Sequence, residues 1–108
     1  MINLDFPIQW NLGYNYLLGP AYENLGCWRD KAQPRALHII GRNISPPDVI
    51  LKCFIRARDN GYKVFALQWG QECYVGANDG SYMKYGKATN CDDKGTGGWL
   101  ALEVYRIK

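Results

Sequence analysis

The residues with the clearest chemical potential are four cysteines, Cys27, Cys53, Cys73 and Cys91. They are widely spaced, and no Cys-x-x-Cys pair or Cys/His cluster is present. A structural metal is not expected, because zinc sites usually draw ligands from pairs roughly two to four residues apart. An even number of cysteines in a short, glycine-rich chain favours two disulfides, whose pairing the sequence alone leaves open. Four buried free thiols in a cytosolic domain are the alternative.

Residues for catalysis are scarce. The single histidine, His38, has no serine or cysteine motif beside it, and a general base needs a partner within hydrogen-bond reach. Asp92 and Asp93 are neighbours in a glycine-rich stretch. Two adjacent loop carboxylates do not give the fixed opposition of roughly 5–9 Å that glycoside hydrolysis requires. We therefore expect no enzyme and no cofactor.

Oxygen ligands for calcium occur in two turn-rich stretches, at Asn78, Asp79, Asp92 and Asp93. Calcium prefers such ligands, but the spacing is not that of an EF-hand. Asp and Asn in turns usually accept hydrogen bonds from the local backbone. We predict no metal site, and calcium binding by these loops is the alternative.

Aromatic residues give the strongest indication of a function, since the chain has four Trp and eight Tyr. The C–H face of a sugar stacks on an exposed ring while nearby polar groups bind its hydroxyls, a combination typical of small-ligand sites. The alternative for the tryptophans is burial, because large aromatics dominate protein cores. Two tyrosines, Tyr82 and Tyr85, lie in a polar stretch and are expected to be exposed. The predicted ligand-binding residues are Trp69, Gln71, Tyr74, Asn78, Asp79, Tyr82, Tyr85 and Trp99.

One amphipathic helix is predicted to begin near Ser45 and to end at Asn60-Gly61, about four turns later. Ser45 can cap it, Pro46 suits the first helical position, and Asp48 suits a capping box. Apolar residues at helical spacing would form its buried face. They are Val49, Ile50, Cys53, Phe54 and Ala57.

Strands are predicted where β-branched and aromatic residues gather between turn formers. Gly70-Gln71 would join two of them into a hairpin, and the first and last would pair to close the domain. Turn formers dominate residues 76–98, which predicts a long surface loop, a kind of segment that often carries function. The predicted strands are 22–29, 36–40, 62–69, 72–75 and 99–107.

The length of 108 residues indicates one domain, which we place at residues 21–108 after an N-terminal arm of residues 1–20. The arm is too apolar for a solvated tail, and it lacks the basic start and long apolar run of a signal peptide. It could pack on its own domain, or it could add a strand to a second copy and form a homodimer.

The charge and hydropathy of the chain argue against two kinds of partner. The net charge of +3 comes from basic residues scattered between Arg29 and Lys108, without the basic stripe of a nucleic-acid binder. No stretch reaches the ~20 apolar residues that span a bilayer, so no membrane insertion is expected.

The order of these features resembles the WSC domain family. Leu25–Asp30 and Arg35-Ala36-Leu37 are similar to the opening of WSC domains, and the helix with Cys53 follows in the expected place. The resemblance covers roughly residues 22–107. This chain has four cysteines, fewer than WSC domains usually carry, so it resembles a reduced WSC-like domain related in plan to PAN/apple modules. The other matching segments are Gly61-Tyr62, Phe65–Gln68, Gly70–Gly76, Gly97-Gly98 and Val104-Tyr105.

The resemblance implies an α+β fold, with one amphipathic helix packed across a twisted antiparallel β-sheet and two disulfides. In PAN-like plans the helix is tied to the central sheet, which implies a Cys53–Cys73 bond and leaves Cys27 with Cys91. The family also implies a secreted, extracellular, non-catalytic and lectin-like module that binds carbohydrate. The alternative is a protein–protein interaction module of an adhesion or extracellular-matrix assembly. The expected partner is thus a glycan, or a cell-surface or matrix protein.

Overall fold

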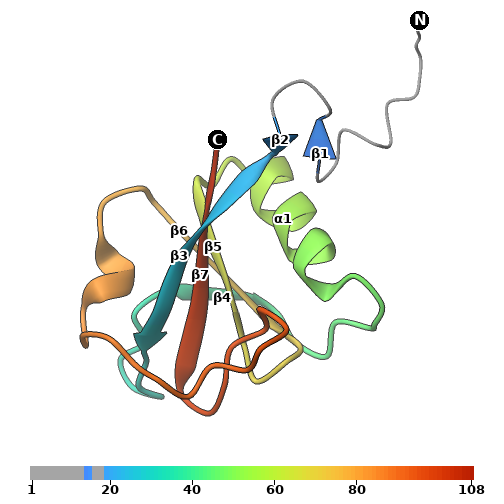
Figure 1. Cartoon of the computed structure of the whole chain (residues 1–108). Coiled ribbons are helices and arrows are strands. Elements are labelled where there is room, and N and C mark those ends of the chain that lie inside the picture. The colour runs from blue at the N-terminus through green and yellow to red at the C-terminus, as the bar shows by residue number, and fades with distance from the viewer. Residues whose placement is uncertain (1–13, 16–18) are drawn as a thin grey trace, which may run out of the picture.

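The computed structural model describes residues 14–15 and 19–108, which form one helix packed on an antiparallel sheet (Figure 1). The α+β fold implied by the family resemblance is confirmed. In chain order the strands and helices are β1 (Tyr14–Asn15), β2 (Gly19–Pro20), β3 (Tyr22–Arg29), β4 (His38–Gly41), α1 (Val49–Asp59), β5 (Val64–Gln68), β6 (Glu72–Gly76), the 3₁₀ helix η2 (Ser81–Met83) and β7 (Ala101–Ile107).

The main sheet has the strand order β3-β7-β5-β6-β4, and each neighbouring pair is antiparallel. The first and last strands of the domain pair along most of their length, from Tyr22 opposite Ile107 to Arg29 opposite Ala101, as predicted. The predicted hairpin is also confirmed, since β5 pairs directly with β6. Two predicted strands were too long, because β5 ends at Gln68 and β7 begins at Ala101.

The helix begins later than the sequence predicted. Its N-cap is Asp48, with φ 61°, and no side chain caps it; the prediction of a start near Ser45 was wrong. Pro47 explains the difference, because a residue that precedes proline is disfavoured in helical conformation and Pro46 is such a residue. The predicted end is confirmed, with Asn60 as the C-cap and Gly61 at φ 80°.

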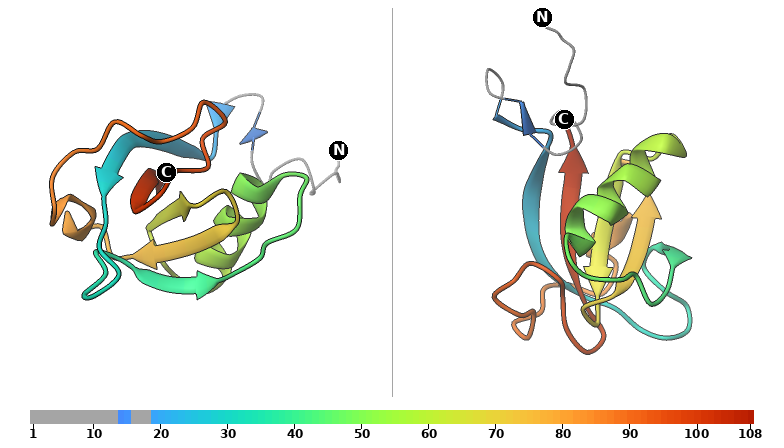
Figure 2. Two further views of the ribbon diagram at one scale, coloured as in Figure 1. Left: turned by 90° about the horizontal axis from the view of Figure 1, so that it is seen from below. Right: turned by 90° about the vertical axis from the view of Figure 1, so that its right-hand side faces the viewer.

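The helix covers one face of the sheet, where the larger part of the core lies (Figure 2). Cys53, Phe54 and Ala57 face inward and are buried, as the helical spacing predicted. Their neighbours on the sheet include Phe65 and Tyr105, whose rings stack with centroids 5.1 Å apart. Burial is the main cause that raises the pKa of Tyr105, whose hydroxyl donates to the carbonyl of Gly95 and so fastens the loop before β7.

The opposite face of the sheet is covered by loops. The core here joins Leu37 to strand residues such as Val64, Leu102 and Val104. Tyr82 and Tyr85, from the segment around η2, pack against it, and Figure 1 shows that segment in orange on the side away from the helix. Residues 77–100 contain only η2 as a helix and no named strand, so the predicted long loop is confirmed.

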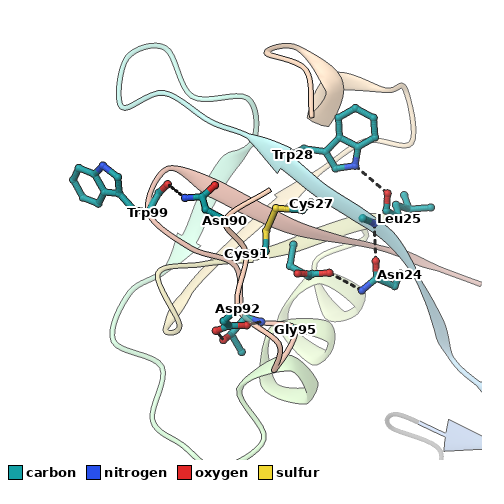
Figure 3. The surroundings of a disulfide bond; sticks show 12 residues. Asn24, Leu25, Cys27, Trp28, Asn90, Cys91, Asp92, Gly95 and Trp99 are labelled. Carbon is teal, nitrogen blue, oxygen red and sulfur yellow. Dashed lines mark hydrogen bonds between the residues drawn. A yellow bond between two sulfur atoms is a disulfide. The ribbon is translucent and has the colours of Figure 1, made fainter. Parts of the chain in front are cut away.

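Both disulfides have the pairing that the family resemblance implied. Cys53–Cys73 ties the helix to β6, and both residues are fully buried. Cys27–Cys91 ties β3 to the long loop across a sequence separation of 64 (Figure 3). All four cysteines are bonded, which excludes the free-thiol alternative.

Most of the predicted N-terminal arm lies outside the described residues, apart from the short β1–β2 pair. Its contacts, its role in a dimer and the domain boundary at residue 20 stay predictions. Among residues 14–15 and 19–108, no helix is long and apolar enough to cross a bilayer.

We predict that Cys53→Ala/Cys73→Ala lowers the free energy of unfolding by about 3 kcal/mol, since the bond closes a loop with a sequence separation of 20. Urea unfolding without reductant measures this. Cys27→Ala/Cys91→Ala is the comparison, and it should retain the helical circular dichroism because its bond does not contact the helix. An unfolding free energy unchanged by the first pair of substitutions would show that the bond is not needed to hold the helix.

Candidate functional site

Two tryptophans lie exposed and side by side at one end of the sheet. Trp69 is 55% exposed and Trp99 65% exposed, and their ring centroids are 4.6 Å apart with an interplanar angle of 62°. The alternative that they are core residues is therefore wrong. Large apolar side chains left in solvent and paired in this way are typical of an interaction site.

Trp69 projects outward because it sits in a tight hairpin turn. It has φ 60°, and the next residue, Gly70, has φ 80°. Trp69, Gly70 and Gln71 form the three-residue loop between the paired residues Gln68 and Glu72, and in β-strand conformation Trp69 would have extended β5 instead. The left-handed conformation is costly for a residue with a side chain, and such strain is found mainly at functional sites.

Trp99 projects from a second tight turn, Gly98–Ala101, which leads into β7. Gly98 and Ala101 exchange backbone hydrogen bonds of 2.9 and 3.2 Å, and Leu100 has φ 48°. The side-chain amide of Asn90 donates to the carbonyl oxygen of Trp99 at 3.0 Å (Figure 3). The carbonyl group of Trp99 is thus held from the long loop while the indole faces solvent.

Backbone hydrogen bonds join the two turns. The N–H of Trp69 donates to the carbonyl of Gly98 at 3.3 Å, and that of Gly70 donates to Thr96 at 3.0 Å. Gly97 makes this approach possible, because a Cβ at that position would overlap the carbonyl oxygen of Leu67. The relative position of the two turns that carry the indoles is therefore fixed by the backbone.

A cleft of about 310 Å³ opens beside the tryptophan pair. We call it the first cleft. Its aromatic wall is joined by polar groups from β5, β6 and the loop after β3, which is the composition expected of a small-ligand site. The lining residues are Ala32, Arg35, Gln68, Trp69, Glu72, Trp99 and Leu100.

The carboxylate of Asp30, fully buried, holds the loop that forms one wall of the first cleft. Asp30 accepts from the backbone N–H of Ala36 at 2.8 Å, from the side-chain amide of Gln68 at 3.1 Å and from the Arg35 guanidinium at 3.4 Å. A buried charge is tolerated only when it is paired and hydrogen-bonded, and here three donors surround it.

The same network continues to Glu72 through Tyr74. Arg35 donates to the Tyr74 hydroxyl at 2.8 Å, and that hydroxyl donates to Glu72 at 2.8 Å. Burial and then the hydrogen bond to Glu72 raise the pKa of Tyr74 above its usual value. Arg42 donates to the other oxygen of Glu72 at 3.2 Å. The charged groups of the first cleft are thus positioned before any ligand arrives.

The structure brings together only part of the predicted binding set. Gln71 is exposed in the same turn as Trp69, so these two and Trp99 lie at one end of the sheet. Tyr74 was expected to contact a ligand, but it is fully buried because both faces of β6 are covered. Its ring cannot stack on a ligand, and only its hydroxyl serves the site, through Arg35 and Glu72.

The remaining predicted residues do not line the first cleft. Asn78 and Asp79 follow β6 at the end opposite to the turn of Trp69. Tyr82 and Tyr85 were expected to be exposed, but they are half-buried, because Tyr82 packs on Trp28 and the hydroxyl of Tyr85 donates to the carbonyl of Pro34. A binding role for these four residues stays a prediction.

Three cleft residues, Arg35, Gln68 and Glu72, were not predicted as binding residues. Gln68 offered a signal, since it is a polar residue at the end of a wholly apolar stretch and proves to be 2% exposed. For Arg35, the only signal is its place in the Arg35-Ala36-Leu37 run that carries the family resemblance. Nothing in the sequence connects either residue to Asp30.

The acidic loop residues bind their own backbone. The side chain and backbone N–H of Ser81 both donate to Asp79, and these bonds lower the pKa of its carboxyl. At Asp92, burial raises the pKa, but hydrogen bonds from Thr96 and Lys94 outweigh it and the net shift is downward. Within the described part of the chain, no three His, Cys, Asp or Glu side chains gather as metal ligands.

Comparison with known families gives one match. A family model described as WSC domain matches residues 24–98. This range includes both disulfides, α1, the β5–β6 hairpin and the residues of the first cleft other than Trp99 and Leu100. A search of curated proteins finds no match.

We predict that Asp30→Asn lowers the free energy of unfolding by about 2–3 kcal/mol, because an amide nitrogen would replace an acceptor of Arg35 and Gln68. Urea unfolding measures the change. Arg42→Gln breaks an exposed ion pair in the same region, and it should change stability by less than about 0.5 kcal/mol. Equal effects of the two substitutions would contradict a special role for the buried carboxylate.

Proposed function

Since the chain belongs to the WSC domain family, whose members are generally carbohydrate-binding or extracellular sensor modules, we propose that it is a non-catalytic, lectin-like module. A sugar is proposed to bind in the first cleft, against Trp69 and Trp99. The exposed tryptophan pair, carried by two turns that hydrogen-bond to each other and lying next to polar side chains, is the observation that carries the proposal.

The pair suits the shape of a sugar ring. The two indoles meet edge to face with an interplanar angle of 62°, so a sugar ring can stack on an indole face that the other indole leaves free. Burying this aromatic surface is favourable, and the C–H groups of the sugar meet the electron-rich faces of the rings. The cost of ordering is small, because the backbone already fixes both turns.

Polar groups at the first cleft would bind the hydroxyls. Arg35 can donate and Glu72 can accept, and both are only partly exposed, with side-chain exposures of 26% and 22%. Gln71 adds an exposed amide that can do both. A hydroxyl group both donates and accepts, so this set of groups matches it.

The carboxylates near the first cleft support binding without hydrolysis. Asp30 is enclosed by three donors, and Glu72 accepts from Tyr74 and Arg42. A glycoside hydrolase needs two carboxyl groups facing each other across the sugar, one of them ready to give up a proton. We therefore assign these carboxylates to holding the loop and binding the ligand.

An extracellular location is proposed on the basis of the disulfides. Both bonds are formed, and disulfides persist mainly in oxidising compartments. The WSC family is compatible with this location.

Exposed tryptophan also favours a second candidate, a protein-interaction module of an adhesion or matrix assembly. Trp and Arg are enriched among the residues that dominate protein interfaces, and Trp69, Trp99 and Arg35 lie together here. Saturable binding to a matrix protein, lost in Trp99→Ala, with no binding to any glycan, would favour this candidate.

We predict that Trp69→Ala and Trp99→Ala each weaken glycan binding at least about tenfold, a loss of roughly 1.4 kcal/mol of stacking and apolar contact. A glycan array identifies ligands, and calorimetry with the best one gives the affinities. Met83→Ala is the control, because Met83 is 46% exposed and does not line the first cleft. Retention of full affinity in both tryptophan variants would refute the proposed site.

A further inference from the structure

We propose that the glycan is anionic, and that its charged groups lie against a cationic surface formed by Lys31, Lys84 and Lys87 and against Arg29 in a neighbouring cleft. The inference rests on the proposed carbohydrate binding and names the class of ligand. That class is an acidic polysaccharide with carboxylate or sulfate groups.

The fold gathers these four exposed residues from two distant parts of the sequence. The ammonium groups of Lys31 and Lys84 lie 4.8 and 5.5 Å from the centroid of the same ring, that of Tyr85. Lys87 lies over the ring of Trp28 at 5.5 Å. Arg29 follows Trp28 in β3 and therefore points to the other face of the strand, where it lines a cleft with Thr89 and Asn90.

Three half-buried rings support this surface. Trp28 and Tyr82 meet edge to face with centroids 5.2 Å apart, and Figure 3 shows the Trp28 indole beside the segment that contains η2. Trp28 also pairs with Lys87 in an isolated β-bridge. The lysines therefore lie on a packed aromatic base that holds their stems near one another.

Among the described residues, the charge of this surface has no counterpart. The ion pairs among the described residues are Arg35–Asp30, Arg42–Glu72, Arg58–Asp59 and Arg106–Glu23, and none includes the four cations. Asp30 is buried against Arg35, and Asp79 is bound by Ser81. Lys31 and Lys84 both lie near the ring of Tyr85 without an acidic partner, so an anionic ligand would compensate their charge.

A second cleft connects the cationic surface to the tryptophans. It measures about 350 Å³ and shares Trp99 and Leu100 with the first cleft. Its far wall includes Arg29, and Ala32, the neighbour of Lys31, lines the first cleft. A chain of sugars that crosses Trp99 would thus place its next units at Arg29, and the lysines, which line neither cleft, would meet the units beyond them.

The chemistry of the surface favours a polysaccharide over a polynucleotide. Proteins that bind single strands offer free aromatic faces to successive bases, along a basic groove. Here Tyr82 and Tyr85 are half-buried, and cations occupy the faces of Tyr85 and Trp28. The accessible groups are separate cationic charges beside one stacking site, the tryptophan pair. This arrangement suits charged groups that are spaced along a sugar chain.

The test compares two polymers that share one sugar backbone, polygalacturonate and its methyl ester, by calorimetry on the whole chain at low and high NaCl. We expect tighter binding of polygalacturonate, with an advantage that shrinks as salt rises. Lys84→Gln/Lys87→Gln should weaken binding of polygalacturonate roughly 3- to 10-fold and leave the ester unaffected. Lys63→Gln/Lys108→Gln removes the same charge from exposed positions elsewhere and should change neither.

The inference is overturned if the two polymers bind equally, if neither binds, or if the control pair has the effect of the lysine pair. Tighter binding of polyuridylate or of phosphatidylserine vesicles through the same lysines would also overturn it. Trp99→Ala separates the two proposals. If it abolishes binding of an array-identified glycan while the lysine pair has no effect on polygalacturonate, carbohydrate binding stands and the anionic class falls.

Discussion

The arrangement of both candidate surfaces depends on how residues 77–100, which contain no named strand, are fastened to the sheet. The Cys27–Cys91 disulfide fixes the middle of this segment to β3. On one side of the bond, Ala88 donates to the carbonyl of Cys27. On the other side, the N–H of Asp92 donates to Gly97, which lies against the end of β5. A loop held in this way can present its side chains in fixed positions. Ordering such a loop costs chain entropy, and the disulfide lowers this cost because it already restricts the unfolded chain.

The sequence predicted the fold well where local rules decide the structure. Helical spacing identified the buried face of α1, and the β-branched and aromatic runs identified the strands. The pairing of the cysteines came from the family resemblance, since four cysteines alone allow several pairings. The prediction of the helix start was wrong because two conformational preferences of proline compete at Pro46-Pro47. Proline favours a first helical turn, but it also opposes helix in the residue before it.

The site was predicted only in part, because exposure depends on the whole sheet. β6 lies between β5 and β4 with both of its faces covered, so Tyr74 is as buried as its neighbours Cys73 and Val75. Trp69 and Trp99 look like strand residues in the sequence. They are exposed because each lies in a tight turn. Trp69 itself has a positive φ, and Trp99 precedes Leu100, which also has a positive φ. The hydrogen bonds around Asp30 and the cationic surface both join segments that are distant in the sequence, and no local sequence pattern indicates such contacts.

In the proposed mode of binding, the two surfaces would have different roles, because their charges are compensated differently. In the first cleft, Arg35 faces Asp30 and Glu72 faces Arg42, so the cleft acts at short range through stacking and hydrogen bonds. The cations of the cationic surface form no ion pair among the described residues. Unpaired charge acts at longer range, where it affects the rate and the orientation with which a ligand approaches. Asp30 lines the second cleft, where the two surfaces meet, and it is the one acid there. Its carboxylate is paired with the Arg35 guanidinium, so the negative charge that Asp30 presents to an anionic ligand in the second cleft is largely compensated.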